Sequence, residues 1–371
     1  MDDSDYMRRA IALARQGAGW TSPNPMVGAV IVKQGNIIGE GYHKKCGELH
    51  AERNAFASLT ESAQGATLYV TLEPCCHQGR TPPCTDAVIQ NGIRRVVIGS
   101  RDPNPLVSGK GADVLRQHGI TVEEDFLREE CDALNPVFFH YITTGRPYVV
   151  MKYARTLDGK IATHTGASQW ITGETARQHV HQLRGRYSAI LAGIGTVLAD
   201  DPLLNCRIPG SHQPVRIIAD SRLRLPLNSR LVKTAREYRT IVVCTDTFPE
   251  KEASLRSMGV EVLRLPNPDG RVDLRELVLY LGRNQLDSVL IEGGGQLHEA
   301  ALTAGIVNHV CAYIAPKLFG GASAKTPVEG LGVYMPDDSA RLHHLQITPL
   351  DEDLLLEYDM KEGMNGVYWN C

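Results

Sequence analysis

The sequence predicts an α/β protein made of two domains. The chain has 371 residues, and a single hydrophobic core rarely grows beyond about 250 to 300 residues. Amphipathic helical segments alternate with short runs of β-branched and aromatic residues, which is typical of helices packed on a sheet. A hydrophobic fraction of 43% provides enough apolar side chains for two cores.

The first half shows this alternation clearly. Residues 1–17 predict an amphipathic helix, and residues 27–43 predict a β-hairpin that turns at Gln34-Gly35-Asn36. The other elements expected in this half are helices at 50–59 and 85–91 and strands at 66–74 and 93–100.

A hinge is expected at 134–147, LNPVFFHYITTGRP, because this stretch combines two prolines, a glycine and two threonines. We place the boundary near Gly145, which gives domains of 1–145 and 146–371. A simple internal loop is the alternative.

The second half contains the short apolar runs SAILAG, VRIIAD, TIVVCT and SVLIEG, which predict buried parallel strands. HVCAYIAPKLFGG and LEYDMK are expected as edge strands. Residues 172–186 predict a helix capped by Thr172, and Asp158-Gly159 predicts a hairpin-type turn.

The composition of the chain argues against three classes of protein: nucleic-acid binders, membrane-spanning proteins and secreted proteins. A net charge of −3 and a pI near 6.5 do not provide the basic surface of a nucleic-acid binder. No apolar run approaches the roughly 18 residues of a membrane span, and the acidic N-terminus is not a secretory signal. The nine cysteines are therefore expected in a reducing cytoplasm, where clustered cysteines indicate a metal site.

Four residues predict a zinc centre with a proton carrier. His50 and Glu52 open a predicted helix, Cys75 follows Pro74 at the end of a predicted strand, and Cys84 opens the next helix. A catalytic zinc takes three nitrogen or sulfur ligands and leaves a position for water. We therefore expect His50, Cys75 and Cys84 as ligands and Glu52 as the catalytic acid and base, which is the pattern of zinc deaminases as a class.

The spacing of the cysteines leaves alternatives open. Eight residues, CHQGRTPP, separate Cys75 from Cys84, and Cys76 and His77 in this insertion are also potential ligands. A closed structural zinc site with Cys76 as fourth ligand would leave Glu52 without a role. The other alternative is a pair of buried structural cysteines beside a surface His–Glu pair.

Over almost its whole length the chain resembles the bacterial bifunctional riboflavin-biosynthesis deaminase–reductases. The motifs in the first half are PNPMVGAVIV, GEGYHKKCGELHAE, YVTLEPCCHQGRTPPCTDAVI and DPNP. Those in the second half are KYARTLDGKIAT, SQWIT, LRGRYSAILAGIGTVLADDPLLNCR, PVRIIADSRLRLP and LIEGGGQL. The extended insertion between the cysteines is itself a feature of this family.

The resemblance implies two fold types and two reactions. Residues 1–145 would form a cytidine-deaminase-like α/β/α sandwich that binds Zn²⁺ and deaminates a diamino-ribosylamino-pyrimidinone 5′-phosphate. Residues 146–371 would form a dihydrofolate-reductase-like domain that uses NADPH to reduce the ribosyl group to a ribityl chain. The family also implies a homo-oligomer that acts on a small molecule.

The resemblance further assigns residues to sites. In the first half, Asn24, Asp102 and Asn104 would line the substrate cleft, and the additional candidates for phosphate or ring contacts are His43, Lys45, His77 and Arg80. In the second half, the implied substrate residues are Lys152, Ser168, Arg184, Leu204, Arg207 and Glu292. The implied cofactor residues are Ala154, Trp170, Thr196, Asp200, Ser221, Gly293, Gly294, Gly295, Gln296 and Leu297.

Two features of the second site have a physical rationale of their own. The glycine run 293–295 stands between a predicted strand and a predicted helix, where backbone amides can bind a phosphate. Lys152 and Glu292 are the candidates for a general acid. There are two competing hypotheses: a nucleic-acid deaminase with an accessory binding domain, and a non-catalytic protein that keeps the fold. The nucleic-acid deaminase would need a basic, aromatic-lined groove.

Overall fold

The structure is a computed structural model that describes residues 1–77, 82–104 and 107–360. The described residues divide into two compact units, one of Met1–Gly145 and one that begins at Arg146. Arg80, a candidate substrate contact, lies outside the described residues. No described helix is long and apolar enough to cross a membrane.

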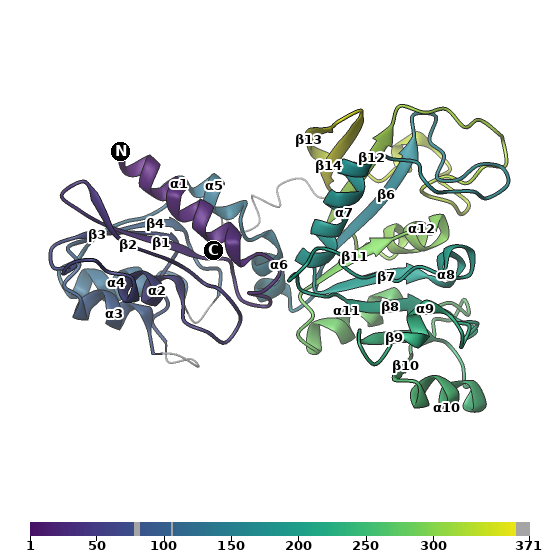
Figure 1. The fold of residues 1–371 in the computed structure, drawn as a ribbon, viewed down its shortest axis with the longest axis horizontal. Helices are drawn as coiled ribbons and strands as arrows, with labels where there is room; N and C mark the ends of the chain where they lie inside the picture. The colour runs from purple at the N-terminus through teal and green to yellow at the C-terminus, as the bar shows by residue number, and fades with distance from the viewer. Residues whose placement is uncertain (78–81, 105–106, 361–371) are drawn as a thin grey trace. The chain divides into compact units, whose positions relative to one another are not determined.

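The first unit is an α/β/α sandwich around a five-stranded sheet in the order β2-β1-β3-β4-β5 (Figure 1). The β1–β2 and β1–β3 pairs are antiparallel, and β3, β4 and β5 are parallel. The strands are β1 (Gly28–Lys33), β2 (Asn36–Tyr42), β3 (Thr67–Leu72), β4 (Arg95–Ser100) and β5 (Thr121–Glu123). The helices are α1 (Asp3–Ala14), α2 (Ala51–Ala57), α3 (Cys84–Gln90), α4 (Lys110–Gln117), α5 (Arg128–Asp132) and α6 (Pro136–Thr144).

The two faces of strand β1 build the two cores of this sandwich. Ala29 and Ile31 belong to the cluster shared with α2, α3 and α4, whereas Val30 and Val32 belong to the cluster under α1. This is the period of two that a strand buried on both faces requires. Gly28 permits α1 to approach closely, because a Cβ at this position would lie 1.9 Å from the Ala10 carbonyl oxygen.

The segment expected as a hinge, 134–147, is mostly helical, because Pro136–Thr144 forms helix α6. Pro136 stands in the first turn, where its missing N–H is not needed. Gly145 ends the helix with a φ of 67°, a left-handed conformation that glycine adopts readily. Phe138 and Phe139 are buried with Leu72, so this segment is part of the core of the first unit.

The second unit is built on a nine-stranded sheet in the order β10-β9-β8-β7-β11-β6-β12-β14-β13. The strands from β10 to β12 in this order are parallel, and β14 pairs antiparallel with both β12 and β13. The strands are β6 (Tyr148–Thr156), β7 (Ala189–Gly193), β8 (Val215–Ala219), β9 (Thr240–Cys244), β10 (Val260–Arg264), β11 (Ser288–Glu292), β12 (His309–Ala315), β13 (His343–Leu350) and β14 (Asp353–Asp359). The helices are α7 (Glu174–Arg186), α8 (Ile194–Asp200), α9 (Arg230–Lys233), α10 (Pro249–Ser257), α11 (Leu274–Arg283) and α12 (Gly295–Thr303).

The sequence misassigned three details of this unit. β12 and β14 are interior strands, and β13 occupies the edge instead. Thr172 does not cap α7: the Asp353 carboxylate accepts a hydrogen bond of 2.7 Å from the N–H of Gly173, the N-cap residue. Asp158-Gly159 forms a turn but not a hairpin, because β6 pairs on both sides with the parallel strands β11 and β12.

Candidate functional site: a metal centre and a cofactor edge

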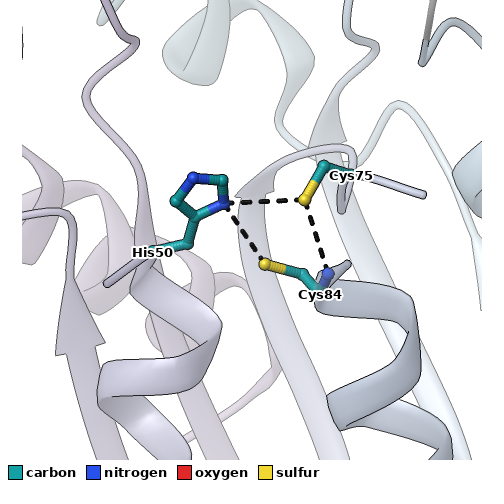
Figure 2. Close-up of side chains that lie close together, drawn as sticks. All are labelled: His50, Cys75 and Cys84. Carbon is teal, nitrogen blue, oxygen red and sulfur yellow. Dashed lines mark hydrogen bonds between the residues drawn. The ribbon is translucent and has the colours of Figure 1, made fainter. Parts of the chain in front are cut away.

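The predicted zinc ligands meet at the ends of three elements of the first unit (Figure 2). His50 is the N-cap residue of α2, Cys75 follows β3, and Cys84 is the first residue of α3. The His50 Nδ1 atom lies 3.6 Å from the Cys75 Sγ and 3.3 Å from the Cys84 Sγ. The strand end and the two helix starts therefore bring three metal-binding atoms together.

Backbone contacts fix the two cysteines relative to each other despite the long insertion. The Cys84 N–H donates to the Cys75 carbonyl at 3.0 Å and points to the Cys75 Sγ at 3.4 Å. The Arg53 guanidinium, on α2, donates to the carbonyls of Pro82 and Pro83. The end of the insertion is therefore tied to the helix that carries His50.

This donor set fits a catalytic zinc ion. A tetrahedral zinc with bonds of about 2.0–2.3 Å holds its ligand atoms roughly 3.3–3.8 Å apart, which matches the separations observed. The group of mutually close ligand atoms contains three residues, and Cys76 is not one of them although it is described. Hydrogen bonds with Cys84 and His50 outweigh burial and lower the pKa of Cys75, which favours the thiolate that zinc binds.

Glu52 lies beside the three ligands without belonging to the group. It stands in the first turn of α2, its side chain contacts the Cys84 thiol, and it is only 3% exposed. Burial, and then the neighbouring Cys75, raise the pKa of Glu52. A raised pKa favours the protonated form of the carboxyl group, and a general acid and base must be able to hold a proton and pass it on.

Asn24 is oriented by a histidine that the sequence did not identify as a positioning group. The buried His43 ring contacts the Leu49 carbonyl through Nδ1 at 3.0 Å, so Nδ1 carries the proton and Nε2 accepts from the Asn24 side-chain amide at 3.3 Å. This arrangement leaves the Asn24 carbonyl oxygen available to a ligand. The His43 and His50 rings are 5.5 Å apart, which places Asn24 near the metal set.

Glu73, which the sequence-based prediction did not include, contacts Asp102 and the residues at the start of α4. The buried Glu73 carboxylate accepts hydrogen bonds from the N–H groups of Gly109, Gly111 and Ala112 at 3.0, 2.9 and 3.3 Å. The Asp102 N–H also points to this carboxylate, at 3.5 Å. Glu73 directly follows β3 and stands 36 residues before Gly109, so no local pattern in the sequence indicates this contact.

Asp102 itself is 7% exposed and accepts a hydrogen bond from the Asn104 N–H at 2.8 Å. Burial raises the pKa of Asp102 to about 7. Two other candidates are less central: the Lys45 ammonium lies over the Trp20 ring at 5.3 Å, and the buried His77 Nδ1 has no hydrogen-bond partner among the described residues.

All predicted cofactor residues of the second unit except Trp170 lie in or after strands that end at one edge of its sheet. Strands β8, β7, β11 and β6 are parallel, so their carboxyl ends share this edge, where open α/β sheets bind ligands. Ala154 lies near the end of β6, Thr196 and Asp200 lie in α8 after β7, Ser221 follows β8, and residues 293–297 follow β11.

The glycine run forms a close-fitting turn at this edge. Gly293 and Gly294 both have a φ of 86°, which side chains other than glycine rarely adopt. A Cβ on Gly293 would lie 3.0 Å from the Thr196 hydroxyl. Gln296 and Leu297 occupy the first turn of α12. The exposed amides of such a turn and helix start suit a phosphate group.

A buried ion cluster stands beside the glycine turn. The Arg184 guanidinium binds the Glu292 carboxylate with two hydrogen bonds of 2.7 and 2.8 Å, and the Lys152 ammonium lies 3.8 Å from it. Burial alone would raise the pKa of Glu292, but Arg184 and Lys152 lower it to about 2. Burial lowers the pKa of Lys152, so this lysine can serve as a proton donor more readily than an exposed one.

The remaining predicted residues differ in what they can contribute. The Ser168 hydroxyl donates to Asp200 at 3.4 Å, and the Trp170 ring is 61% exposed beneath the Arg177 guanidinium. Arg207 is exposed. Leu204 packs in the hydrophobic core, so only its backbone is available to a ligand.

Tyr313 is a further residue of this region that the sequence analysis did not identify. Its fully buried ring lies under the Lys152 ammonium at 5.5 Å, and its hydroxyl contacts the His179 Nδ1 at 2.7 Å. The alternation of His309, Cys311 and Tyr313 along β12 was the available signal, because alternate residues share one face of a strand.

Comparison with known proteins agrees with both halves of this architecture. The family model described as the cytidine and deoxycytidylate deaminase zinc-binding region matches residues 1–100, and the RibD C-terminal domain matches residues 147–356. The riboflavin biosynthesis protein RibD of Actinobacillus pleuropneumoniae is 58% identical over 358 residues, which cover 96% of this chain and 95% of the relative. RibD of Bacillus amyloliquefaciens is 42% identical, with 98% and 99% covered.

Solved structures extend the likeness to the fold. Acinetobacter baumannii RibD, form 1, superposes with a TM-score of 0.86 at 39% identity and covers 97% of this chain and 99% of that one. A Thermotoga maritima protein titled diaminohydroxyphosphoribosylaminopyrimidine deaminase/5-amino-6-(5-phosphoribosylamino)uracil reductase gives a TM-score of 0.83 at 40% identity, with 96% and 98% covered. The predicted fold class is confirmed, and the chain belongs to the RibD family of riboflavin biosynthesis proteins.

Proposed function

We propose that the first unit deaminates 2,5-diamino-6-ribosylamino-4(3H)-pyrimidinone 5′-phosphate by hydrolysis and that the second reduces the ribosyl group of the product with NADPH. The observation that carries this proposal is the set of three zinc-binding atoms with the buried Glu52 beside it. The family membership and the glycine turn opposite Thr196 support the second reaction. The final product is 5-amino-6-ribitylamino-uracil 5′-phosphate.

In the deamination, His50, Cys75 and Cys84 would hold the zinc, which when bound lowers the pKa of a water molecule and makes it a nucleophile. Glu52 would accept the proton of that water and return it to the departing amine. The Asn24 carbonyl oxygen, fixed by His43, would orient the pyrimidine. Asp102 and Asn104 would complete the substrate cleft.

In the reduction, the bound NADPH supplies the hydride. The amides of 293–297, together with Ala154, Trp170, Thr196, Asp200 and Ser221, would bind and orient it. Ser168, Arg184, Arg207 and the backbone at Leu204 would hold the substrate phosphate and sugar. Lys152, which is buried beside Glu292, would deliver a proton to the opening ribose ring.

We propose that the substrate is a small-molecule ribotide and that the enzyme does not act on nucleic acid. We also propose that the protein is cytoplasmic and homo-oligomeric. We also propose that the deaminase domain comprises 1–145 and the reductase domain 146–371. A fragment of residues 146–371 should fold and bind NADPH; an unfolded fragment would move this boundary.

Mass spectrometry of the reaction tests both activities and their order. Incubation with the diaminopyrimidinone ribotide alone should raise its mass by about one unit, and added NADPH should raise it by about two more, from replacing NH with O and adding two hydrogens. An unchanged substrate mass would contradict the first reaction. Deamination of single-stranded DNA or RNA instead would favour the nucleic-acid alternative.

A further inference from the structure

The second unit contains another group of metal-binding side chains, remote in sequence from the cysteines of the first unit. His309 and Cys311 on β12 and Glu357 on β14 offer one ligand atom each, and the three atoms all lie within 4.8 Å of one another. Cys311 pairs directly with Glu357 across the two strands, and His309 pairs with Asp359. Antiparallel pairing therefore places all four side chains on one face of the sheet.

The separations match those of the zinc ligands in the first unit. The His309 Nε2 lies 3.6 Å from a Glu357 carboxylate oxygen, and the Cys311 Sγ lies 3.8 Å from the same oxygen. A tetrahedral zinc ion holds nitrogen, sulfur and oxygen ligands roughly 3.3–3.8 Å apart. The imidazole, the thiol and the carboxylate thus stand where a single ion can bind all three.

Asp359 holds the imidazole in the orientation that a metal requires. Its carboxylate lies 2.9 Å from the His309 Nδ1, so Nδ1 carries a proton and Nε2 faces Cys311 and Glu357. Histidines that bind metals usually donate their other ring nitrogen to a carboxylate in this way. His344 of β13 contacts the second oxygen of Asp359 at 3.3 Å, which leaves Asp359 as a supporting group.

An ion pair alone accounts for only part of this arrangement. His309 could pair with Glu357 and Asp359 without Cys311, because a neutral thiol is a weak hydrogen-bond donor. Yet Cys311 is 1% exposed and points at the carboxylate. A thiolate, two carboxylates and the nearby Arg186 of α7 would together balance the charge of a divalent ion. The His309 and Glu357 side chains are 20% and 25% exposed, which gives the ion a path from solvent.

We propose that His309, Cys311 and Glu357 form a second metal site, of the zinc class, that joins strands β12 and β14 of the second unit. The site is separate from the catalytic metal of the first unit. Its ion would tie the antiparallel end of the sheet together beside β6, whose Lys152 pairs directly with Cys311.

Metal content of the full chain tests this proposal. Chain stripped by a chelator under reducing conditions, reloaded with zinc and freed of excess should hold two zinc ions by inductively coupled plasma mass spectrometry. Cys311→Ser should hold one. Cys244→Ser is the matched control, because Cys244 is another buried cysteine of the same sheet, and it should keep two. One ion in the wild type, or two in Cys311→Ser, would overturn the proposal.

Cobalt absorption provides an independent test that does not depend on the stability of one variant. In a Cys75→Ser/Cys84→Ser chain the first site has no thiolate, so a remaining thiolate-to-cobalt charge-transfer band should come from Cys311. Glu357→Gln in that background should weaken cobalt binding at least tenfold, whereas His344→Gln should leave the band in place. Absence of the band, or its persistence after Cys311→Ser is added, would sink the assignment.

Discussion

The two units position their functional groups by different means. In the first unit, His50 and Cys84 are 34 residues apart and belong to short segments at the starts of adjacent helices. In the second, Arg184 and Glu292 are 108 residues apart and meet only because the fold brings helix α7 to the last residue of strand β11. The first site therefore depends on a local motif, and the second depends on the topology of a sheet.

This difference predicts how each site fails. The groups of the metal centre act on the reacting atoms, so substitutions there should remove activity and leave the second unit unaffected. The groups at the sheet edge include a buried ion cluster, whose loss leaves charges unpaired in the interior. Substitutions there should reduce stability as well as activity.

Removing one metal ligand should have the largest effect. Cys84→Ser should lose zinc from the first site and reduce deamination to background, because the ion activates the attacking water. Reduction of the already deaminated ribotide by the same variant should stay within about twofold of wild type. Assays of each step with its own substrate measure this. Joint loss of both reactions would contradict the independence of the two units.

Glu52→Gln should separate proton transfer from metal binding. The amide cannot carry the proton, so the deamination rate should fall by about 10²- to 10⁴-fold while metal analysis finds the zinc retained. Glu48→Gln is a suitable control, because Glu48 is an exposed carboxylate of the same segment, and it should keep normal turnover. Normal turnover by Glu52→Gln would remove Glu52 from the proton-transfer role.

Breaking the ion cluster tests whether the groups at the sheet edge of the second unit contribute to stability. Glu292→Gln leaves Arg184 and Lys152 buried without a negative partner, which should lower the free energy of unfolding of the second unit by about 3 kcal/mol. Glu261→Gln breaks an exposed pair with Arg239 and should cost less than about 1 kcal/mol. Urea unfolding followed by circular dichroism measures both. Equal losses in the two variants would argue that the cluster is not a stability element.

The same contrast decides what the sequence could predict. His50, Glu52, Cys75 and Cys84 were identifiable because their residue types and spacing describe the chemistry by themselves. The cofactor residues at the sheet edge of the second unit could be predicted only from the family resemblance. No local pattern in the sequence links Thr196 to Gly293. Helix α6 was missed because proline and glycine mark helix ends as well as loops. Strands β12 and β14 were misplaced because their apolar pattern does not reveal how many neighbours pair with them.

A pH-dependent contribution from Asp102 gives the smallest expected effect and extends the stability argument to the first unit. Burial raises the Asp102 pKa from 3.8 to about 7, so the folded chain holds a proton that the unfolded chain releases above about pH 4. The stabilisation is complete below that pH and is lost as pH rises through 7. Asp102→Asn cannot ionise, so its free energy of unfolding should gain about 2 kcal/mol relative to wild type between pH 5 and 7. Asp113→Asn, on the exposed face of α4, should show no such gain. A parallel pH profile for Asp102→Asn and wild type would mean that the folded chain binds no extra proton at Asp102.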